Sequence, residues 1–382
     1  MEDFRVAVDE DVLDDLRERL RRTRWPDHIE GSGWEYGTDY DYLRGLCEYW
    51  RQDFDWRAAE TRINAWPQII TRVAGQRIHA IHAPSRHDGA TPLLLVHGWP
   101  GSIVEFLDVL GPLTDPPAYG GDAADAFSVV CPSLPGYAWS GPTTERGWDV
   151  RKIASAMVDL MAQLGYQRFG YQGGDWGGLI GSALGAAYPE RLIGLHLNLV
   201  PVPRPTSPDA LAELTPRERD AMEEYARFSA EETGYSAIQG TRPQSLAYAL
   251  NDSPAGLAGW IIEKFRRWSD CEGDVERAFS RDHLLTNVTT YWVTGTAGSS
   301  ARLYYESRKA KSFGAPTSTV AVPTGVAIFP RELSRPPKSW VRRHYDLRHW
   351  SEPPRGGHFA AMEQPDLFAA DVRAFFRGLR PQ

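Results

Sequence analysis

Apolar residues recur at helical spacing in the first part of the chain and at strand spacing after it. Leu13, Leu16 and Leu20 lie three or four positions apart, and two more stretches with this period follow. These stretches carry many aromatic side chains, which need a larger body to pack against. We therefore expect residues 1–66 to form an N-terminal helical segment wrapped on a core rather than an independent domain.

Beyond residue 66, short strands alternate with helices. A hairpin is expected over 69–83, and apolar strands are expected at 92–96, 127–131, 169–172 and 192–197. Helical patterns separate the later strands. Because this alternation is typical of a parallel sheet with right-handed crossovers, residues 67–203 predict the first part of an α/β core.

The alternation stops at a proline-rich exit after Val200. Residues 204–316 are mostly helical in pattern, and a strand pattern returns only at 326–329, within the final segment 317–382. A helical insertion between two parts of an α/β core is the layout of a lid or cap. We expect an α/β fold with a mostly parallel sheet, an N-terminal helical wrap and an inserted helical cap.

The composition excludes several classes of protein. Hydrophobic residues make up 42% and charged residues 24% of the chain, an ordinary globular mixture that argues against disorder. The net charge of -8 argues against nucleic acid as a partner. No apolar run approaches the ~18 residues that a membrane helix needs, and the acidic N-terminus is not a signal peptide. We expect a cytoplasmic protein that does not bind membranes.

Neither the cysteines nor the histidines predict a metal site. Cys47, Cys131 and Cys271 lie far apart without CxxC spacing, so we interpret them as buried thiols. His79 and His82 are three positions apart in the expected hairpin and would point to opposite faces of a strand. We interpret these two histidines as surface or edge residues, and we expect neither a metal nor an organic cofactor.

The strongest chemical signal is the segment Gly173–Gly177, which has the form glycine-x-nucleophile-x-glycine with Asp175 in the nucleophile position. A strand pattern precedes it and a helix of small residues follows, as a sharp strand-to-helix turn requires. A glycine-rich turn in which Asp175 only caps the helix is the alternative. The chain contains no G-x-S-x-G motif, which disfavours a serine esterase or lipase.

A second motif, His97–Ser102, directly follows the apolar strand at 92–96. In an α/β-hydrolase architecture, a loop at this place contributes a backbone N–H to the oxyanion hole, together with the N–H of the residue after the nucleophile. We expect those donors to be the amides of Trp99 and Trp176. We give His97 itself an orienting role and no catalytic one.

A late histidine completes the pattern of a catalytic triad. His358 follows a pair of glycines, which leave its loop free to place the imidazole over the elbow, and the order nucleophile, acid, histidine is that of this fold. For the acid, Glu332 comes just after the expected strand at 326–329, where catalytic groups of open α/β sheets collect. Asp346 is the runner-up, because the pattern shows no strand immediately before it.

With these motifs the sequence resembles the microsomal-type epoxide hydrolases, a branch of the α/β-hydrolase superfamily. The resemblance extends over almost the whole chain and rests on Thr23–Pro26, Gly33–Gly37, His97–Ser102, Pro132–Tyr137, Gln172–Gly177, Gly234–Gln239, Ala249–Pro254, Phe329–Glu332 and Arg355–Ala361. It implies an α/β-hydrolase fold and an enzyme without cofactors. The chain lacks the N-terminal anchor of the membrane-bound members, so we expect a soluble, bacterial-like form.

The resemblance also implies roles for individual residues. Asp175 matches the nucleophile of the family, and His358 with Glu332 matches the pair that activates water. Tyr235 matches the first of two cap tyrosines that hold the epoxide oxygen. For the second tyrosine, Tyr304 matches best and Tyr305 stays open. The residues expected around the substrate are Trp99, Pro100, Trp176 and Tyr305.

The implied activity is the opening of an epoxide to a vicinal diol through an ester on the nucleophilic aspartate. The 14 Trp and 16 Tyr residues favour a bulky or aromatic epoxide as the small-molecule partner. The resemblance leaves open a role in enediyne-like antibiotic biosynthesis, a role in detoxification, and a homodimer. The alternatives are a haloalkane dehalogenase, in which Trp176 would bind halide, and a catalytically inactive binding protein.

Overall fold

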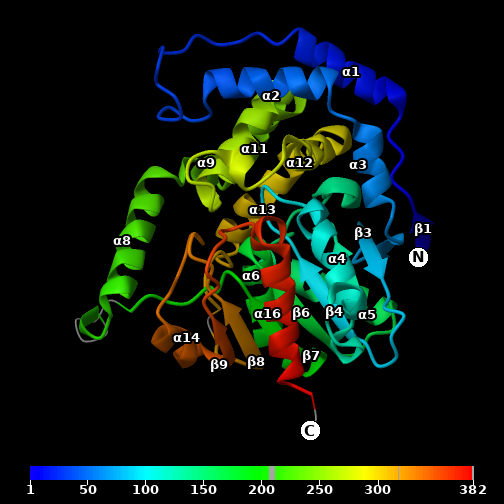
Figure 1. Cartoon of the computed structure of the whole chain (residues 1–382), viewed down its shortest axis with the longest axis vertical. Helices are drawn as coiled ribbons and strands as arrows, with labels where there is room; N and C mark the ends of the chain where they lie inside the picture. The colour runs from blue at the N-terminus through cyan, green and yellow to red at the C-terminus, as the bar shows by residue number, and fades with distance from the viewer. Residues whose placement is uncertain (206–210, 317, 381–382) are drawn as a thin grey trace.

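The computed structural model describes residues 1–205, 211–316 and 318–380 (Figure 1). Within these residues one nine-stranded sheet has the order β1-β2-β3-β5-β4-β6-β7-β8-β9. The strands are β1 (Glu2–Phe4), β2 (Gln68–Val73), β3 (Gln76–Ala83), β4 (Thr91–Val96), β5 (Phe127–Pro132), β6 (Phe169–Gly173), β7 (Leu192–Leu197), β8 (Val320–Ala327) and β9 (Tyr345–Ser351). The α/β fold expected from the sequence is confirmed.

The sheet is mostly parallel, as the alternation of strands and helices predicted. Strands β5, β4, β6, β7, β8 and β9 pair in parallel. Strands β1, β2 and β3 form an antiparallel flank that joins β5. The expected hairpin is the pair β2–β3, with Ile69 opposite Ala80. The carboxyl ends of β4 and β6 therefore lie side by side, which brings the two motifs that follow them together.

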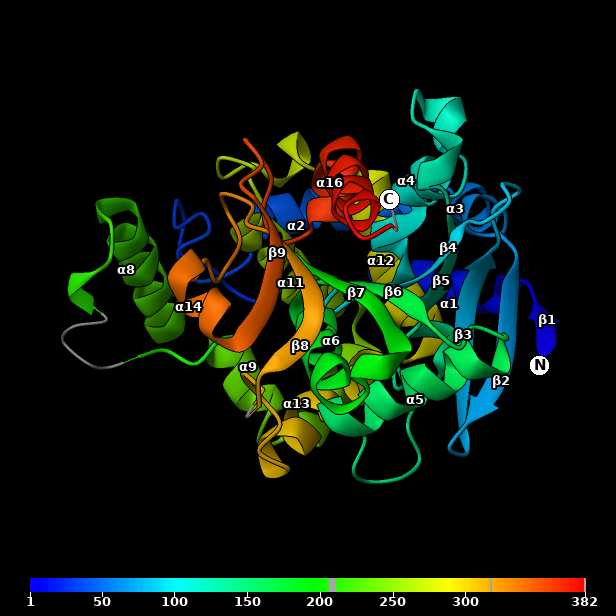
Figure 2. The same ribbon diagram turned by 90° about the horizontal axis from the view of Figure 1, so that it is seen from below.

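Helices cover both faces of the sheet (Figure 2). α5 (Val150–Gln163) and α6 (Asp175–Ala187) lie on one face, and α4 (Leu107–Thr114) and α16 (Pro365–Arg377) lie on the other. β4 serves both layers, because Leu94 and Leu93 point to opposite sides and belong to separate hydrophobic cores. The shorter helices are η1 (Ile103–Phe106), η2 (Pro116–Tyr119), η3 (Ala123–Asp125), η4 (Ala138–Ser140), η5 (Pro189–Arg191), α14 (Lys338–His344) and α15 (Ala360–Glu363).

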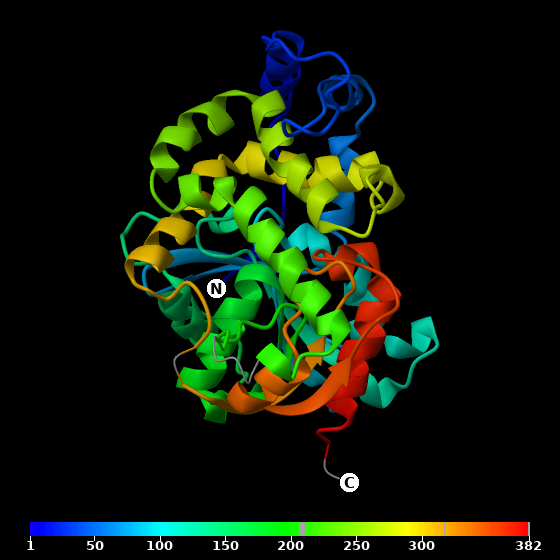
Figure 3. The ribbon, with the colours of Figure 1, turned by 90° about the vertical axis from the view of Figure 1, so that its left-hand side faces the viewer.

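Between β7 and β8 the chain forms an inserted helical layer above the sheet. Its helices are α8 (Pro216–Glu231), α9 (Gly234–Gln239), α10 (Pro243–Asp252), α11 (Pro254–Trp268), η6 (Val275–Arg277), α12 (Arg281–Thr294) and α13 (Ala297–Lys309), all inside the range 204–316 expected for the cap. α8 has no buried residue and stands at the outer edge of the layer, on the side seen in Figure 3. Part of the proline-rich exit, at 206–210, and residue 317 lie outside the described residues.

The N-terminal segment packs on this insertion. It forms the expected helices α1 (Glu10–Arg21), α2 (Tyr40–Gln52) and α3 (Trp56–Ile63), which lie against α11 and α12 (Figure 1). The buried indole N–H of Trp50 donates a hydrogen bond to Thr289 Oγ1 at 2.9 Å. The segment is not purely helical, because Glu2–Phe4 adds strand β1 to β2. No helix of the described residues has the length and apolar character that crossing a membrane requires.

The last two strands differ from the sequence expectation. β8 starts at Val320 and ends at Ala327, so most of it precedes the predicted strand at 326–329. β9 was not expected at all, because Tyr345 is its only buried residue and the strand therefore lacks an apolar pattern. Asp346 is the second residue of this unexpected strand, which follows helix α14, so no strand ends immediately before it.

His79 also differs from the expectation, because it is buried rather than at the surface or an edge. Its Nδ1 lies 2.9 Å from Ser133 Oγ, and its Nε2 lies 3.0 Å from Gln68 Oε1. Burial lowers the pKa of His79 to about 3, so the ring is neutral at neutral pH. His82 is part-buried and bonds the hydroxyl of Tyr166 at 3.0 Å. The three cysteines are buried, as expected.

Candidate active site

The expected elbow is the turn from β6 into α6. Asp175 is the first residue of α6, and its φ of 46° lies in the left-handed region that non-glycine residues rarely adopt. A Cβ on Gly177 would collide with the carbonyl oxygen of Val96 in β4, so glycine is required there. The turn thus holds Asp175 in a strained conformation at the carboxyl edge of the parallel strands, at the N-terminus of a helix that favours a carboxylate.

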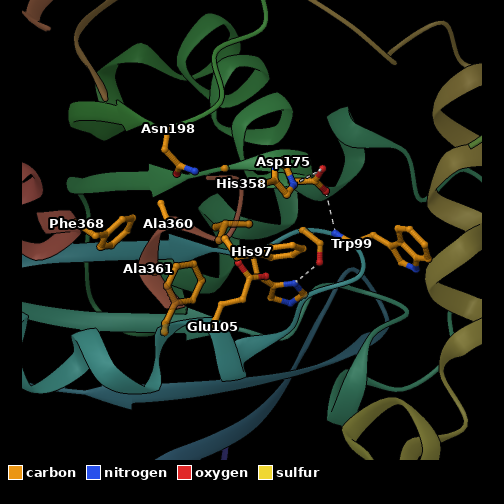
Figure 4. Close-up of a pocket in the computed structure, with 14 residues that line it drawn as sticks. His97, Trp99, Glu105, Asp175, Asn198, His358, Ala360, Ala361 and Phe368 are labelled. Carbon is orange, nitrogen blue, oxygen red and sulfur yellow. Dashed lines mark hydrogen bonds and ion pairs between the residues drawn. The ribbon is translucent and has the colours of Figure 1, made fainter. Parts of the chain in front are cut away.

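The loop His97–Ser102 lies beside the elbow. The backbone N–H of Trp99 donates a hydrogen bond to Oδ1 of Asp175 at 2.9 Å (Figure 4). A Cβ on Gly98 would collide with the Asp175 side chain, so this approach depends on glycine. One of the two expected oxyanion donors therefore faces the expected nucleophile. The other, the amide of Trp176, follows Asp175 in the first turn of α6.

The inserted helix α12 fixes this loop from above. Asn287 Nδ2 donates to the carbonyl of Pro100 at 2.8 Å, and Asn287 Oδ1 accepts from Ser102 Oγ at 2.7 Å. The hydroxyl of Tyr291 donates to the carbonyl of Gly101 at 2.7 Å. Sequence reasoning missed Asn287 and Tyr291, since polar residues within a helix give no signal of a partner so distant along the chain.

His97 has the orienting role that the sequence suggested. Its Nε2 accepts a hydrogen bond from the backbone N–H of Leu134 at 3.2 Å, and its Nδ1 therefore donates to the carbonyl of Gly98 at 3.0 Å. Burial lowers the pKa of His97 to about 4, which keeps the ring neutral. Both ring nitrogens hold backbone groups, so this side chain is not a candidate base.

His358 lies between two carboxylates. Its Nε2 is 3.3 Å from Oδ2 of Asp175, and its Nδ1 is 2.7 Å from Oε1 of Glu332 (Figure 4 shows the former pair). Burial disfavours the imidazolium, but the charges of Glu332 and Asp175 outweigh this effect and raise the pKa of His358 well above its ordinary value. The expected nucleophile and acid are thus both in contact with the expected histidine, which lies between them.

Glu332, rather than Asp346, is the carboxylate beside the histidine. Its side chain is fully buried, and Oε1 also accepts the backbone N–H of Leu333 at 2.7 Å. Asp346 forms an ion pair with Arg348 at 2.8 Å and makes no hydrogen bond or ion pair with His358 in the described part of the chain. The order of preference inferred from the strand before Glu332 is therefore consistent with the geometry.

The histidine loop is held by the insertion and by the acid loop. The backbone N–H of His358 donates to the carbonyl of Trp268 at 2.9 Å, and Arg331 N–H donates to the carbonyl of Gly356 at 3.1 Å. A Cβ on Gly357 would crowd that same carbonyl of Trp268, and Gly356 has a φ of 108°. The glycine pair before the histidine is therefore required by close packing as well as by the turn.

Two further acids, Asp270 and Glu363, were missed in the sequence. Glu363 Oε2 accepts the backbone N–H of Asp270 at 2.8 Å, and its Oε1 accepts that of Phe359 at 3.0 Å. Asp270 Oδ2 accepts the N–H of Gly356 at 2.9 Å. Burial raises the pKa of Glu363 to about 7. Through these hydrogen bonds, Asp270 and Glu363 hold Gly356 and Phe359, on either side of His358, against the segment that follows α11.

The two expected tyrosines lie next to each other, against Trp99 and Trp176. The ring of Tyr235 stacks on Trp99 at a centroid distance of 5.0 Å, and that of Tyr304 stands edge-on to Trp176 at 4.6 Å. Their own centroids are 5.9 Å apart. Burial, together with the charge of Asp175, raises the pKa of Tyr235 and Tyr304 above the ordinary value, so both phenols keep their protons.

A pocket of about 220 Å³ opens onto Asp175. Trp176, Tyr235 and Tyr304 line it, and the remaining walls are mostly apolar, including Leu179, Leu199, Val200, Phe228, Phe313 and Leu333. Tyr305 is not among the lining residues, and its ring instead lies 5.8 Å from the Lys309 ammonium. Pro100 and Trp99 do not line it either, so Trp176 alone of the four residues expected around the substrate does, and Trp99 lines a different cavity.

A second, much smaller cavity of about 10 Å³ lies beside Asp175 and His358 (Figure 4). His97, Trp99, Glu105, Asp175, Asn198 and His358 are among the residues that line it. Sequence reasoning did not single out Glu105 or Asn198. In the described part of the chain, no group of three His, Cys, Asp or Glu residues could hold a metal ion.

Family models match both parts of this architecture. Residues 1–106 match the epoxide hydrolase N terminus, and residues 91–227 match the alpha/beta hydrolase fold. The two matches overlap over residues 91–106, a range that includes strand β4 and the loop His97–Ser102.

Whole-chain relatives carry corresponding names. The chain is 46% identical over 381 residues to a putative epoxide hydrolase of Stigmatella aurantiaca (strain DW4/3-1), covering 99% of this chain and 85% of that protein. It is 39% identical to epoxide hydrolase 1 of Oryctolagus cuniculus, covering 97% and 88% respectively.

Solved structures agree with this similarity. The epoxide hydrolase of Aspergillus niger superposes with a TM-score of 0.89 at 29% identity, over 99% of this chain and 96% of that one. The juvenile hormone epoxide hydrolase of Bombyx mori superposes with a TM-score of 0.85 at 32% identity, over 99% and 94%.

Proposed function

Since this chain belongs to the epoxide hydrolase family, with the α/β-hydrolase fold, we propose that it opens an epoxide to a vicinal diol through an ester on Asp175. The observation that carries the proposal is the position of His358 between Asp175 and Glu332, together with a pocket that Asp175, Tyr235 and Tyr304 line.

The first step joins the substrate to the enzyme. Asp175 attacks a ring carbon of the epoxide, and the carbon–oxygen bond of the ring breaks as the ester bond forms. Tyr235 and Tyr304 donate hydrogen bonds to the developing alkoxide, which is otherwise a poor leaving group. The alkoxide takes up one proton to become the first hydroxyl of the product, and the imidazolium of His358 has that proton to give.

Ester formation itself prepares His358 for the second step. The ester carries no charge, so one of the two interactions that keep the imidazole protonated disappears. The neutral ring then accepts a proton from water while the water oxygen attacks the ester carbonyl. The amides of Trp99 and Trp176 stabilise the resulting oxyanion. As it collapses, the bond between Cγ of Asp175 and the substrate oxygen breaks, and that oxygen takes the proton left on the attacking water oxygen, which completes the diol. Asp175 returns to a carboxylate and His358 to an imidazolium, so the cycle is balanced.

The walls of the larger pocket support a bulky, apolar or aromatic substrate. Besides Asp175, the rings of Trp176, Tyr235 and Tyr304 line this pocket. Such walls bind apolar surface and leave the tyrosine hydroxyls to orient the epoxide oxygen. The expected role in antibiotic assembly or detoxification stays a prediction.

A single turnover in heavy-oxygen water tests the mechanism. With enzyme in excess over styrene oxide, water attacks the ester carbonyl, so the heavy oxygen should enter the Asp175 carboxylate and not the diol. Peptide mass mapping of the enzyme and mass analysis of the diol locate the label. Label found in the first-turnover diol would mean that water attacks the epoxide directly, and the ester proposal would fail.

Experiment can test the two alternative functions that the sequence left open. A haloalkane dehalogenase shares the aspartate nucleophile, but it needs halide donors where this pocket presents phenols. Chloride release from chloroalkanes faster than diol formation from epoxides would favour it. An inactive binding protein would form no diol, although it would keep the ligand pocket. The ordered contacts of Asp175, His358 and Glu332 favour catalysis over binding alone.

A further inference from the structure

The small cavity beside Asp175 is lined by a carboxyl group that the proposed mechanism does not use, that of Glu105. Glu105 and Asn198 line this cavity together with Asp175 and His358 (Figure 4). Its volume of about 10 Å³ is close to the space that one water molecule needs. A bound water also requires two to four polar partners, and these side chains supply them. The cavity therefore has the size and the lining of a single-water site.

The chain is built to bring Glu105 to this place. Ser102 Oγ accepts the backbone N–H of Val104 at 3.2 Å and so starts the short helix η1 that carries Glu105. A Cβ on Gly101 would collide with the Glu105 carboxyl group, just as one on Gly98 would collide with Asp175. The two glycines of one loop thus make room for two carboxyl groups, one on each side.

The larger pocket and the small cavity have only Asp175 in common among their lining residues. A substrate in the larger pocket therefore reaches Asp175 from one side and leaves the small cavity free. His358 lines only the small cavity. A water there lies next to the base and to the aspartate that becomes the ester, without competing with the substrate.

Resting on the proposed function, we propose that the small cavity holds the water that hydrolyses the ester, and that Glu105 is the residue that positions this water. In that step a water O–H bond breaks, its proton passes to Nε2 of His358, and the oxygen bonds to Cγ of Asp175. Glu105 only makes a hydrogen bond and exchanges no proton. Asn198 contributes its side-chain amide, whose Oδ1 is already held by Gln172 at 2.8 Å.

The protonation state of Glu105 agrees with such a role. Burial, with the charge of Asp175 among the smaller causes, raises the pKa of Glu105 to about 8. At neutral pH the group is therefore mostly a neutral acid, which can both donate and accept a hydrogen bond. A glutamine at this position offers the same two functions, whereas a leucine of similar size offers neither.

Single-turnover kinetics of Glu105→Gln and Glu105→Leu, with styrene oxide and quench-flow mass analysis, separate the two chemical steps. Losing one positioned hydrogen-bonding group should slow ester hydrolysis about a hundredfold in Glu105→Leu. Its ester formation should stay near the wild-type rate, so the adduct on Asp175 accumulates. Glu105→Gln should hydrolyse the ester at nearly the wild-type rate. If the leucine variant does not fold, Glu105→Ala gives the same readout.

Asp125→Asn is the matched control. Asp125 is a buried carboxylate paired with Arg377 and Arg380, remote from the cavity, so this variant should lose stability without accumulating ester. The inference fails if Glu105→Leu hydrolyses the ester as fast as the wild type, or if both of its steps slow equally, as a distorted loop would cause. If the wild type forms no ester on Asp175, the proposed function fails first and the inference with it.

Discussion

The backbone carbonyl of Trp268 accepts a hydrogen bond from the backbone N–H of His358 at 2.9 Å. Trp268 is the last residue of α11, and its ring stands edge-on to the imidazole at 5.2 Å. The insertion is therefore not only a cover for the pocket, because it also positions the histidine of the core. The N-terminal helices that pack on α11 support this arrangement from the outer side.

We expect Asp175→Ala to abolish diol formation while the protein stays folded. The substitution removes the covalent nucleophile, so the rate of diol formation should fall by many orders of magnitude. The glycines of the elbow are unchanged, so the protein should still fold. Diol yield by chromatography and thermal unfolding by circular dichroism check the two parts. A folded variant with near-normal turnover would contradict the assignment of Asp175.

His358→Gln should block the second step far more than the first. The attacking carboxylate needs no base, and without the imidazolium the alkoxide takes its proton from solvent, whereas the attacking water loses its base. The ester should accumulate and appear as a mass increase equal to that of the epoxide. Absence of the adduct together with unchanged turnover would show that His358 is not the base.

We expect Tyr235→Phe and Tyr304→Phe each to slow ester formation. The phenols act on the alkoxide, which forms only as the ring opens, and removal of one such donor costs about a hundredfold to a thousandfold. The two donors share one oxygen, so each single variant keeps part of the activity and the double variant should be nearly inactive. Hydrolysis of an ester once formed should change little.

Tyr305→Phe is the control for this series. Tyr305 neighbours Tyr304 in α13, but its ring lies near Lys309 and away from the pocket, so its loss should be silent. A larger effect for Tyr305→Phe than for Tyr304→Phe would reverse the choice between them. Silence of all three variants would favour the dehalogenase reading.

Glu332→Gln should move the pH dependence of ester hydrolysis to lower pH. Burial lowers the pKa of His358, and the charge of Glu332 is the main influence that raises it. Hydrolysis needs the neutral ring, so its rate rises as the pH passes the pKa of His358 in the ester. Without the carboxylate that pKa falls, and the rising limb shifts downward in pH. The plateau should also drop, because the ring loses its orienting partner.

Single-turnover hydrolysis of the ester from about pH 5 to pH 9 measures this shift, a range that spans the ordinary histidine pKa. Asp346→Asn, which removes the carboxylate paired with Arg348, is the control and should leave the limb in place. If the rising part of the pH–rate profile does not shift in Glu332→Gln, Glu332 does not set the protonation of His358.

Local sequence was enough to find the residues whose position depends on neighbouring backbone. Glycines that the turns require lie on both sides of Asp175 and directly before His358, and Glu332 follows a strand, so short motifs singled out all three. The parallel order of β4 and β6 then brought the elbow and the loop His97–Ser102 to one edge. The turns follow from local sequence, whereas the pairing of β4 with β6 joins strands far apart along the chain.

Side chains that reach the site from a helix could not be placed in the same way. Successive helix positions differ by about 100° in direction, so the chain alone left Tyr304 and Tyr305 open, and packing against Trp176 decided between them. Glu105, Asn287 and Trp268 gave no signal either, since their contacts join distant segments.

The sequence by itself thus predicted the alternation of strands and helices in the core and singled out Asp175, His358 and Glu332, because glycine turns and apolar periodicity are local properties. Only the tertiary structure decided which tyrosine faces the pocket, that His79 is buried, that β9 exists, and that a second cavity lies behind Asp175. Each of these depends on what a residue packs against, and that partner lies far away along the chain.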